Sequence, residues 1–246
     1  MDTKDLFSDT AADYAKYRPV YPKVLAKVIS KLTTYKGVVW DCATGNGQLA
    51  VLLADYFNLV CASDLSAQQI KNAPAHKGIH YSVQPAHQTD YPEHFFDAVT
   101  VGQAIHWFAN DAFYNEVRRV LKPGGVITCV GYGLCKVDGA VDAWLQHFYR
   151  SVVGPYWEPE RKLIDDGYAS LYFPFEPVAM PHFDMECQWR LEQFEGYIQT
   201  WSAVKKMTET VGAQSLHAHW QTLAQAWGNT AVRKVSFPLL VKAGRV

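Results

Sequence analysis

One short stretch, residues 37–49, constrains the fold more than any other part of the chain. An apolar run ending in Trp40 leads into an acid, Asp41, and two glycines, Gly45 and Gly47, follow before an apolar helical pattern begins. Glycine adopts positive φ angles without steric cost and lets a ligand approach the backbone closely. A helix N-terminus offers free N–H groups and the positive end of a dipole. The stretch therefore predicts a strand, a glycine loop and a helix that together bind a ligand.

The rest of the chain repeats this alternation of strands and helices. Strands are predicted over residues 37–42, 59–63, 79–83, 95–101, 126–131 and 232–243, with a weaker pattern over 183–191. Helices are predicted over residues 22–34, 47–56, 66–73, 111–121, 140–152, 192–204 and 213–227, with a turn over 122–125. Such alternation favours a mostly parallel sheet that is covered on both faces and doubly wound. The sequence thus predicts an α/β, Rossmann-like sheet of about seven strands with an antiparallel C-terminal strand.

Composition narrows the class of protein. The chain has 23 Lys and Arg against 24 Asp and Glu, so a net charge of −1 favours neither nucleic acid nor an anionic membrane as partner. The five cysteines are odd in number, scattered and without a C-x-x-C spacing, which indicates buried thiols and neither disulfides nor a metal site. The polar N-terminus lacks a signal-peptide core, and no apolar run reaches the length of a membrane span. We therefore expect a cytoplasmic protein.

Two acids restrict the ligand of the glycine loop. Asp41 ends the first strand and Asp64 ends the second, and burying either without a partner would be costly. A ligand with an amine and a ribose diol, such as S-adenosylmethionine, would satisfy both. The pattern Gly45-x-Gly47-x-x-Ala50 also fits the relaxed dinucleotide fingerprint. A nicotinamide-dependent oxidoreductase and a cofactor-binding module without catalysis therefore stay open as alternatives.

Several motifs carry a family resemblance that covers nearly the whole chain. Asp41–Gly47, Asp64–Ser66, Gln84–His87 and Arg119–Gly125 resemble the motifs of class I S-adenosylmethionine-dependent methyltransferases. Phe7–Pro22, Gln103–Phe108 and Thr200–Ser202 resemble, more narrowly, the methyltransferase type 11 and trans-aconitate-methyltransferase-like subgroup. The resemblance implies that the chain binds S-adenosylmethionine and moves its methyl group to an acceptor by in-line displacement.

The resemblance also assigns roles to individual residues. Those expected to bind the cofactor are Tyr14, Arg18, Asp41, Gly45, Gly47, Asp64, Leu65, Ala86, His87, Gln103 and Trp107. His106 is the candidate general base because imidazole titrates near neutral pH, although a carboxylate acceptor would need no base. Two positions depart from the family pattern: Ala43 stands where glycine is common, and His87 replaces the acid often found after Ala86.

The acceptor is expected to be a small molecule with a carboxylate or a hydroxyl group. Aromatic candidates for its pocket are Trp144, Tyr149, Trp157, Tyr168, Trp189 and Trp201. Cationic candidates for binding an acidic acceptor are Arg150, Arg161, Lys162 and Arg190. The sequence predicts no oligomeric state.

The composition along the chain changes after residue 132, which indicates how the parts divide. Prolines and aromatic residues crowd residues 153–185, where we expect an irregular lid. The expected parts are an N-terminal arm and helix (1–35), a cofactor-binding Rossmann-like core (36–135), a substrate-side insertion with helices (136–230) and a C-terminal strand that completes the sheet (231–246).

Overall fold

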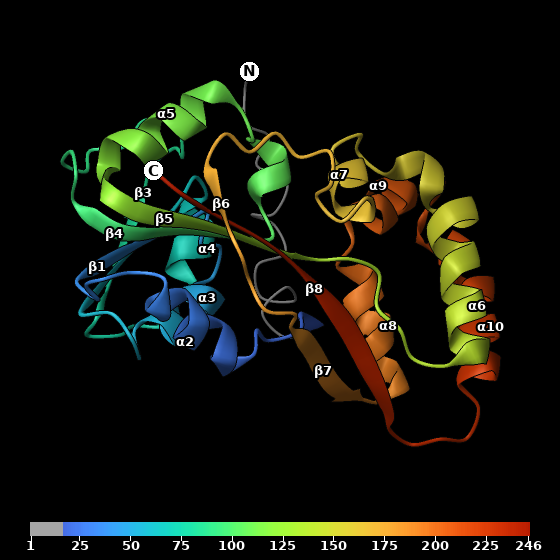
Figure 1. The fold of residues 1–246 in the computed structure, drawn as a ribbon. Coiled ribbons are helices and arrows are strands. Elements are labelled where there is room, and N and C mark those ends of the chain that lie inside the picture. Colours follow the sequence, from blue (N-terminus) through green and yellow to red (C-terminus); the bar gives the residue numbers. More distant parts are fainter. Residues whose placement is uncertain (1–16) are drawn as a thin grey trace.

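The computed structural model describes residues 17–246, and a single mixed β-sheet organises them (Figure 1). The strand order is β3-β2-β1-β4-β5-β8-β6, and β7 pairs with β8 alone. The strands are β1 (Val38–Cys42), β2 (Leu59–Asp64), β3 (Ile79–Val83), β4 (Phe96–Gly102), β5 (Leu121–Tyr132), β6 (Glu176–Val178), β7 (Asp184–Trp189) and β8 (Arg233–Arg245). Strands β1 to β5 are parallel, whereas β8 runs antiparallel to β5. The predicted α/β class and the antiparallel C-terminal strand are confirmed.

Helices cover both faces of the parallel strands because both faces are apolar. We call the parallel strands and these helices the sheet half. Its helices are α2 (Lys23–Lys31), α3 (Gln48–Leu53), α4 (Ala67–Lys71) and α5 (Asp111–Val120). Val39 of β1 belongs to the core cluster that includes α2 and α3, and its neighbour Trp40 belongs to the cluster that includes α5. This alternation follows the two-residue period of a strand.

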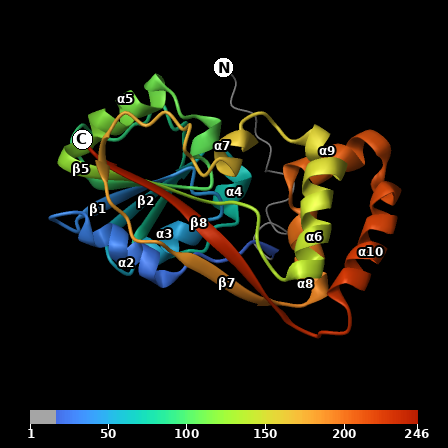
Figure 2. The same ribbon diagram turned by 45° about the vertical axis from the view of Figure 1, so that its right-hand side comes forward.

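A second group of helices, which we call the helical half, lies beside the sheet (Figures 1 and 2). Its members are α6 (Gly139–His147), the π-helix η3 (Phe148–Val152), the 3₁₀ helix η4 (Gly154–Tyr156), α7 (Arg161–Asp165), α8 (Leu191–Gln199), α9 (Ser202–Val211), the 3₁₀ helix η5 (Ala213–Leu216) and α10 (His217–Trp227). Strand β8 connects the two halves, since its first part pairs with β7 and its last part with β5 and β6.

The structure differs from the expected elements in three places. The predicted turn at 122–125 is an irregularity inside β5, where the pairing register with β4 shifts and Gly124 takes a φ of 75°. The single helix expected over 192–204 is divided into α8 and α9, because Trp201 has an extended backbone (ψ 135°). The irregular lid expected over 153–185 contains η4, α7 and β6.

A side chain caps the start of α4. The Ser66 side chain accepts a hydrogen bond from the backbone N–H of Gln69 at 3.2 Å, and α4 begins at the next residue, Ala67.

Among the helices of residues 17–246, none combines the length and the apolar character needed to cross a membrane.

Candidate active site

A cavity of about 580 Å³ opens at the carboxyl ends of β1, β2 and β4. It lies where the strand order reverses, between β1 and β4, which is the usual ligand position in open α/β sheets. We call it the larger cavity. The residues that the family resemblance named and that line this cavity are Arg18, Asp41, Gly45, Asp64, Leu65, Ala86, His87, Gln103 and Trp107. Segments far apart in sequence therefore converge on one site.

The glycine loop between β1 and α3 takes left-handed backbone angles at three positions. Ala43, Gly45 and Gly47 have φ angles of 54°, 57° and 82°. Ala43 and Gly45 line the larger cavity, whereas Gly47 does not. A Cβ atom at Gly47 would lie 2.5 Å from the Tyr81 hydroxyl oxygen of β3. The absence of a side chain at Gly47 therefore allows the loop to pack closely against β3. Ala43 has the left-handed backbone that favours glycine, which is the residue common at this position in the family.

Asp64 connects the end of β2 to the glycine loop. Its Oδ2 accepts a hydrogen bond from the backbone N–H of Gly45 at 2.8 Å, and its Oδ1 accepts one from Ser66 N–H at 2.9 Å. Asp64 also lines the larger cavity, and a carboxylate has about four acceptor sites. The carboxylate can therefore position the loop and bind ligand hydroxyls at the same time.

Asp41 is buried at the end of β1, with 1% of its surface exposed. Its Oδ1 accepts from the Thr100 hydroxyl at 2.8 Å, and its Oδ2 accepts from the Thr44 hydroxyl at 2.5 Å. Burial raises the pKa of Asp41 to about 6, although both hydroxyls favour the ionised form and limit the rise. A positively charged ligand group at this end of the cavity would favour the carboxylate.

Apolar side chains form part of the cavity wall. Leu65 is 46% exposed, and it lines the cavity together with Ala86, His87 and Phe108. An apolar side chain left open at a cavity favours contact with a flat apolar group.

The opposite wall is held by hydrogen bonds between the ends of β4 and β5. The Gln103 side chain donates to the Tyr132 backbone oxygen at 3.1 Å and accepts from the Tyr132 N–H at 2.9 Å. Arg18 donates to the Tyr132 hydroxyl at 3.1 Å and to the Thr200 backbone oxygen at 3.2 Å. The guanidinium of Arg18 also lies 5.5 Å from the ring centre of Tyr197. Arg18 therefore joins the sheet to the helical half at the rim of the cavity.

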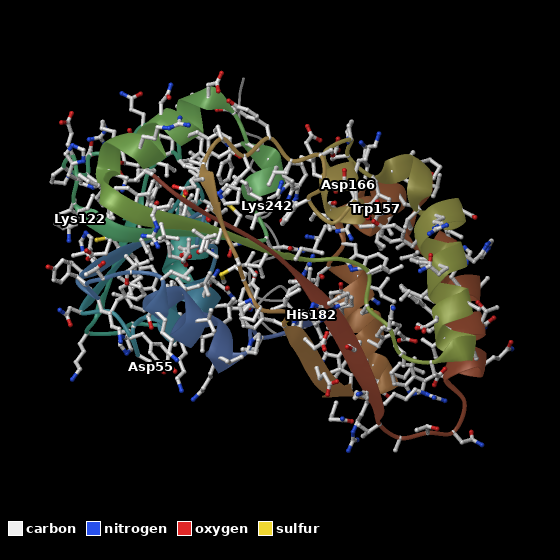
Figure 3. All side chains as sticks on the ribbon, viewed as in Figure 1. Asp55, Lys122, Trp157, Asp166, His182 and Lys242 are labelled. Atoms are coloured by element: carbon white, nitrogen blue, oxygen red, sulfur yellow. The ribbon has the colours of Figure 1, made fainter. Side chains whose placement is uncertain are left out.

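A smaller cavity, of about 40 Å³, adjoins the larger one. Both cavities are lined by Arg18, Gln103, Trp107 and Glu158. The other walls of the smaller cavity are His106, Trp157, Arg161, Ile164, Trp201 and Ser202. Figure 3 shows Trp157 in the segment beside α7, in the helical half of the molecule. The smaller cavity is therefore built where the sheet meets the helical half.

His106 lies in the 3₁₀ helix η2 (Ile105–Trp107) after β4 and is 7% exposed. No hydrogen-bond partner from the described residues reaches its Nδ1 atom. Burial, with the positive charge of Arg161 as a second cause, lowers the pKa of His106 to about 3. The imidazole is therefore neutral near pH 7, where it can accept or donate a hydrogen bond but is a weak proton acceptor.

Arg161 begins α7 and is held by aromatic side chains. Its guanidinium lies 4.7 Å from the ring centre of Trp157 and 5.3 Å from that of Tyr149. Its Nε donates to the Tyr149 hydroxyl at 2.7 Å and lies 3.5 Å from Oδ1 of Asp165. Stacking and the hydrogen bond restrict the guanidinium at the wall of the smaller cavity.

The remaining candidates from the sequence separate into distinct places. Tyr14 lies outside the described residues. Trp157 and Trp201 line the smaller cavity, and Tyr149 reaches it through Arg161. Trp144 stacks on Phe148 of η3, Tyr168 is buried against β5, and Trp189 packs on Tyr197 and Phe237. Of the four cations proposed to bind an acidic acceptor, Arg161 lines a cavity, whereas Arg150, Lys162 and Arg190 are exposed.

Sequence reasoning missed several residues of the site, and four of them bear on its hydrogen bonding and charge. Thr44 and Thr100 hydrogen bond to Asp41, and Tyr132 and Glu158 line the larger cavity. Thr44 lies within the glycine loop, so the family motif could have indicated it. Tyr132 is the last residue of β5, so its position at a strand end could have indicated it. No sequence signal marked Glu158, which comes from the proline-rich segment. Within the described residues, no group of three His, Cys, Asp or Glu side chains could hold a metal ion.

Comparisons with known proteins find methyltransferases. The profile of the family described as "Methyltransferase domain" matches residues 40–129. A Dictyostelium discoideum protein named as a methyltransferase is 30% identical over 243 residues, which cover 96% of this chain and 92% of that protein. A ubiquinone/menaquinone biosynthesis C-methyltransferase of Hydrogenovibrio crunogenus is 26% identical over 195 residues, 75% of this chain and 73% of that protein.

A solved structure shows the same fold over nearly the whole length. It comes from Anaeromyxobacter dehalogenans and is described as a type II methyltransferase. Its TM-score is 0.86 at 37% sequence identity, and the match covers 93% of this chain and 98% of that one.

Proposed function

This chain belongs to the S-adenosylmethionine-dependent methyltransferase family, and on that premise we propose that it methylates a small molecule whose acceptor group enters the smaller cavity. The proposed acceptor group is a carboxylate or a hydroxyl. The observation that carries the proposal is the junction of the two cavities along Gln103 and Trp107, beside Arg161 and the buried His106. The larger cavity would hold the methyl donor, and the smaller one would hold the group that accepts the methyl.

The larger cavity suits S-adenosylmethionine in volume and in the placement of its polar groups. Asp64 offers carboxylate oxygens for the ribose hydroxyls, Leu65 and Ala86 offer an apolar surface for adenine, and Asp41 lies at the amino-acid end. Gly45 lines the cavity, and among the described residues beyond its chain neighbours only Gln69 Oε1, at 3.9 Å, lies within 4 Å of its Cβ position, so a ligand can approach the backbone closely. When bound, the cofactor would supply a methyl group already activated as a sulfonium.

The residues of the chain would act mainly by positioning. Gln103 and Trp107, which line both cavities, would align the acceptor with the methyl group, and alignment of this kind accounts for much of the rate enhancement in such displacements. His106 is a weak base at a pKa of about 3, so it would orient the acceptor through a hydrogen bond. An acceptor that is already ionised needs no base, which favours a carboxylate over a hydroxyl.

We expect Arg161→Gln to raise the KM of a carboxylate acceptor by about 10- to 100-fold, the scale of a charge-assisted hydrogen bond lost from a partly buried site. The measurement is transfer of a radiolabelled methyl group to a panel of small acids and their matched amides. The affinity for S-adenosylhomocysteine should stay unchanged in calorimetry.

Arg150→Gln supplies the matched control, because it makes the same substitution at an exposed position of η3. An equal effect of Arg150→Gln and Arg161→Gln on the KM for acids would contradict the acceptor site. Absence of methyl transfer to every small molecule in the panel would favour a binding module without catalysis.

Cofactor affinity should depend on pH through Asp41. Its carboxyl has a pKa of about 6 without ligand, and a bound ammonium group would lower that pKa, so binding should tighten as the pH rises through 6. We expect the dissociation constant of S-adenosylhomocysteine to rise about tenfold between about pH 7.5 and pH 5. In Asp41→Asn this dependence should disappear. A wild-type dissociation constant that does not change over this range would separate Asp41 from the ligand.

The proposed roles divide the chain into parts. Residues 36–135 would bind the cofactor, and residues 136–230 would supply the acceptor side through Trp157, Arg161 and Trp201. Residues 1–35 would close the site through Arg18, and residues 231–246 would complete the sheet. This division is supported by the origin of the residues that line each cavity.

A further inference from the structure

The loop between β3 and β4 forms one wall of the larger cavity without regular secondary structure. Its first residues, Gln84, Pro85, Ala86 and His87, line the cavity. A wall made of irregular backbone keeps one shape only if other contacts fix it. The structure shows such contacts a few residues further along the loop.

Glu116 of α5 is the centre of these contacts. It is 7% exposed, and its Oε1 accepts from the backbone N–H of Thr89 at 2.9 Å and from the Thr89 hydroxyl at 2.5 Å. Burial by itself would raise the pKa of Glu116, but the hydrogen bonds from Arg119 and Thr89 outweigh it and hold the pKa below its usual value. The carboxylate therefore binds the loop while ionised.

Arg119, one helical turn later, completes the clamp. It donates to both oxygens of Glu116, at 2.6 and 2.8 Å. It also donates to the backbone oxygens of Tyr91 at 2.7 Å and Thr89 at 3.2 Å. Helix α5 thus holds backbone groups of Thr89 and Tyr91 through one partly buried ion pair.

Hydrogen bonds within the loop connect the clamped residues to the cavity wall. The Gln84 side chain accepts from the Asp90 N–H at 3.1 Å and donates to the Ser82 hydroxyl at 3.0 Å. That hydroxyl lies 3.2 Å from the hydroxyl of Tyr91. A shift of Thr89 or Tyr91 would therefore move Gln84 and the cavity-lining residues after it.

We propose that Glu116 and Arg119 are positioning residues, which hold the loop of residues 84–91 in the shape that binds the adenine end of the cofactor. The inference rests on the proposed placement of the cofactor in the larger cavity. Neither residue lines that cavity, so both act through the loop.

The test compares Glu116→Gln with Asp97→Asn. Asp97 is a matched control: it is 5% exposed, accepts a backbone N–H from Val38 at 2.8 Å and pairs with Lys122 at 2.7 Å, but it lies at the opposite end of β4 from the cavity. Figure 3 shows Lys122 at the outer edge of the sheet half, away from Trp157. Calorimetry should show a dissociation constant for S-adenosylhomocysteine about tenfold higher in Glu116→Gln and within twofold of wild type in Asp97→Asn.

A second ligand separates an effect on the adenine wall from an effect on the amino-acid end of the cavity. 5′-Methylthioadenosine keeps the adenine and the ribose but lacks the amino-acid part, so Glu116→Gln should weaken both ligands by the same factor. Arg18→Ala should weaken S-adenosylhomocysteine alone. If Glu116→Gln does not fold, Thr89→Val removes one hydroxyl donor of the clamp and should weaken both ligands about threefold.

Three results are informative in different ways. Wild-type affinity in Glu116→Gln, or an equal loss in Glu116→Gln and Asp97→Asn, would overturn the positioning role. Failure of the wild-type protein to bind S-adenosylhomocysteine would instead overturn the proposed cofactor site. Parallel losses for both ligands in Glu116→Gln, with Asp97→Asn unaffected, would support the proposal.

Discussion

Asp64→Ala should weaken the binding of S-adenosylhomocysteine by about 3 kcal/mol, or roughly 100-fold in dissociation constant. The substitution removes the carboxylate proposed to accept from the ribose hydroxyls. It also releases the backbone N–H groups of Gly45 and Ser66, which hold the glycine loop and the start of α4. Titration calorimetry at constant pH measures the change directly.

Two comparison variants make the Asp64 result specific. Asp64→Asn keeps one oxygen that can accept from a backbone donor, so it should lose about tenfold in affinity. Asp55→Ala removes the same charge at an exposed position after α3 and should leave affinity unchanged (Figure 3). Equal affinities in Asp64→Ala and Asp55→Ala would remove Asp64 from the cofactor site.

Gly47→Ala should lower the free energy of unfolding by about 3 kcal/mol, the sum of two separate costs. The first is the left-handed backbone, since Gly47 has a φ of 82°. The second is overpacking, because the new Cβ would lie 2.5 Å from the Tyr81 hydroxyl oxygen and 3.2 Å from the nearest ring carbons. Equilibrium unfolding in urea measures the total.

A control position separates these two costs. Gly124 has a φ of 75°, but no other described atom lies within 4 Å of the position of its Cβ. Gly124→Ala should therefore cost only about 1 kcal/mol, the backbone part. Adding Tyr81→Phe to Gly47→Ala removes the hydroxyl that the Cβ would meet and should restore about 1 kcal/mol. Identical losses in Gly47→Ala and Gly124→Ala would show that Tyr81 does not limit residue 47.

The elements of the sheet half could be predicted because their signals are local. The apolar runs of the strands and the glycines after Trp40 each act within a few residues of the chain. The helix expected over 192–204 was wrong because the extended backbone at Trp201, in the middle of an apolar pattern, ends α8 and begins α9. Its ring packs against Tyr149, Trp157 and Tyr197, contacts that lie beyond any local pattern.

The site was predicted in part for the same reason. Asp41, Gly45 and Asp64 follow strands directly, so the topology alone brings them to one edge of the sheet. Arg161 could not be distinguished from Arg150, Lys162 and Arg190, because stacking on Trp157 depends on tertiary contacts. The pKa of His106 is low because the folded chain buries its side chain, and burial of this kind is not visible in the local sequence. The low pKa changes the proposed role of His106 from general base to hydrogen-bond partner. The clamp between Glu116 and Thr89 joins residues 27 positions apart.

The most direct test is a crystal structure of the protein with S-adenosylhomocysteine bound. We predict that its adenine contacts Leu65 and Ala86, its ribose hydroxyls donate to Asp64, and its sulfur faces the smaller cavity beside Gln103 and Trp107. A ligand bound outside the larger cavity, or a sulfur atom turned away from His106 and Arg161, would contradict the proposed arrangement of donor and acceptor.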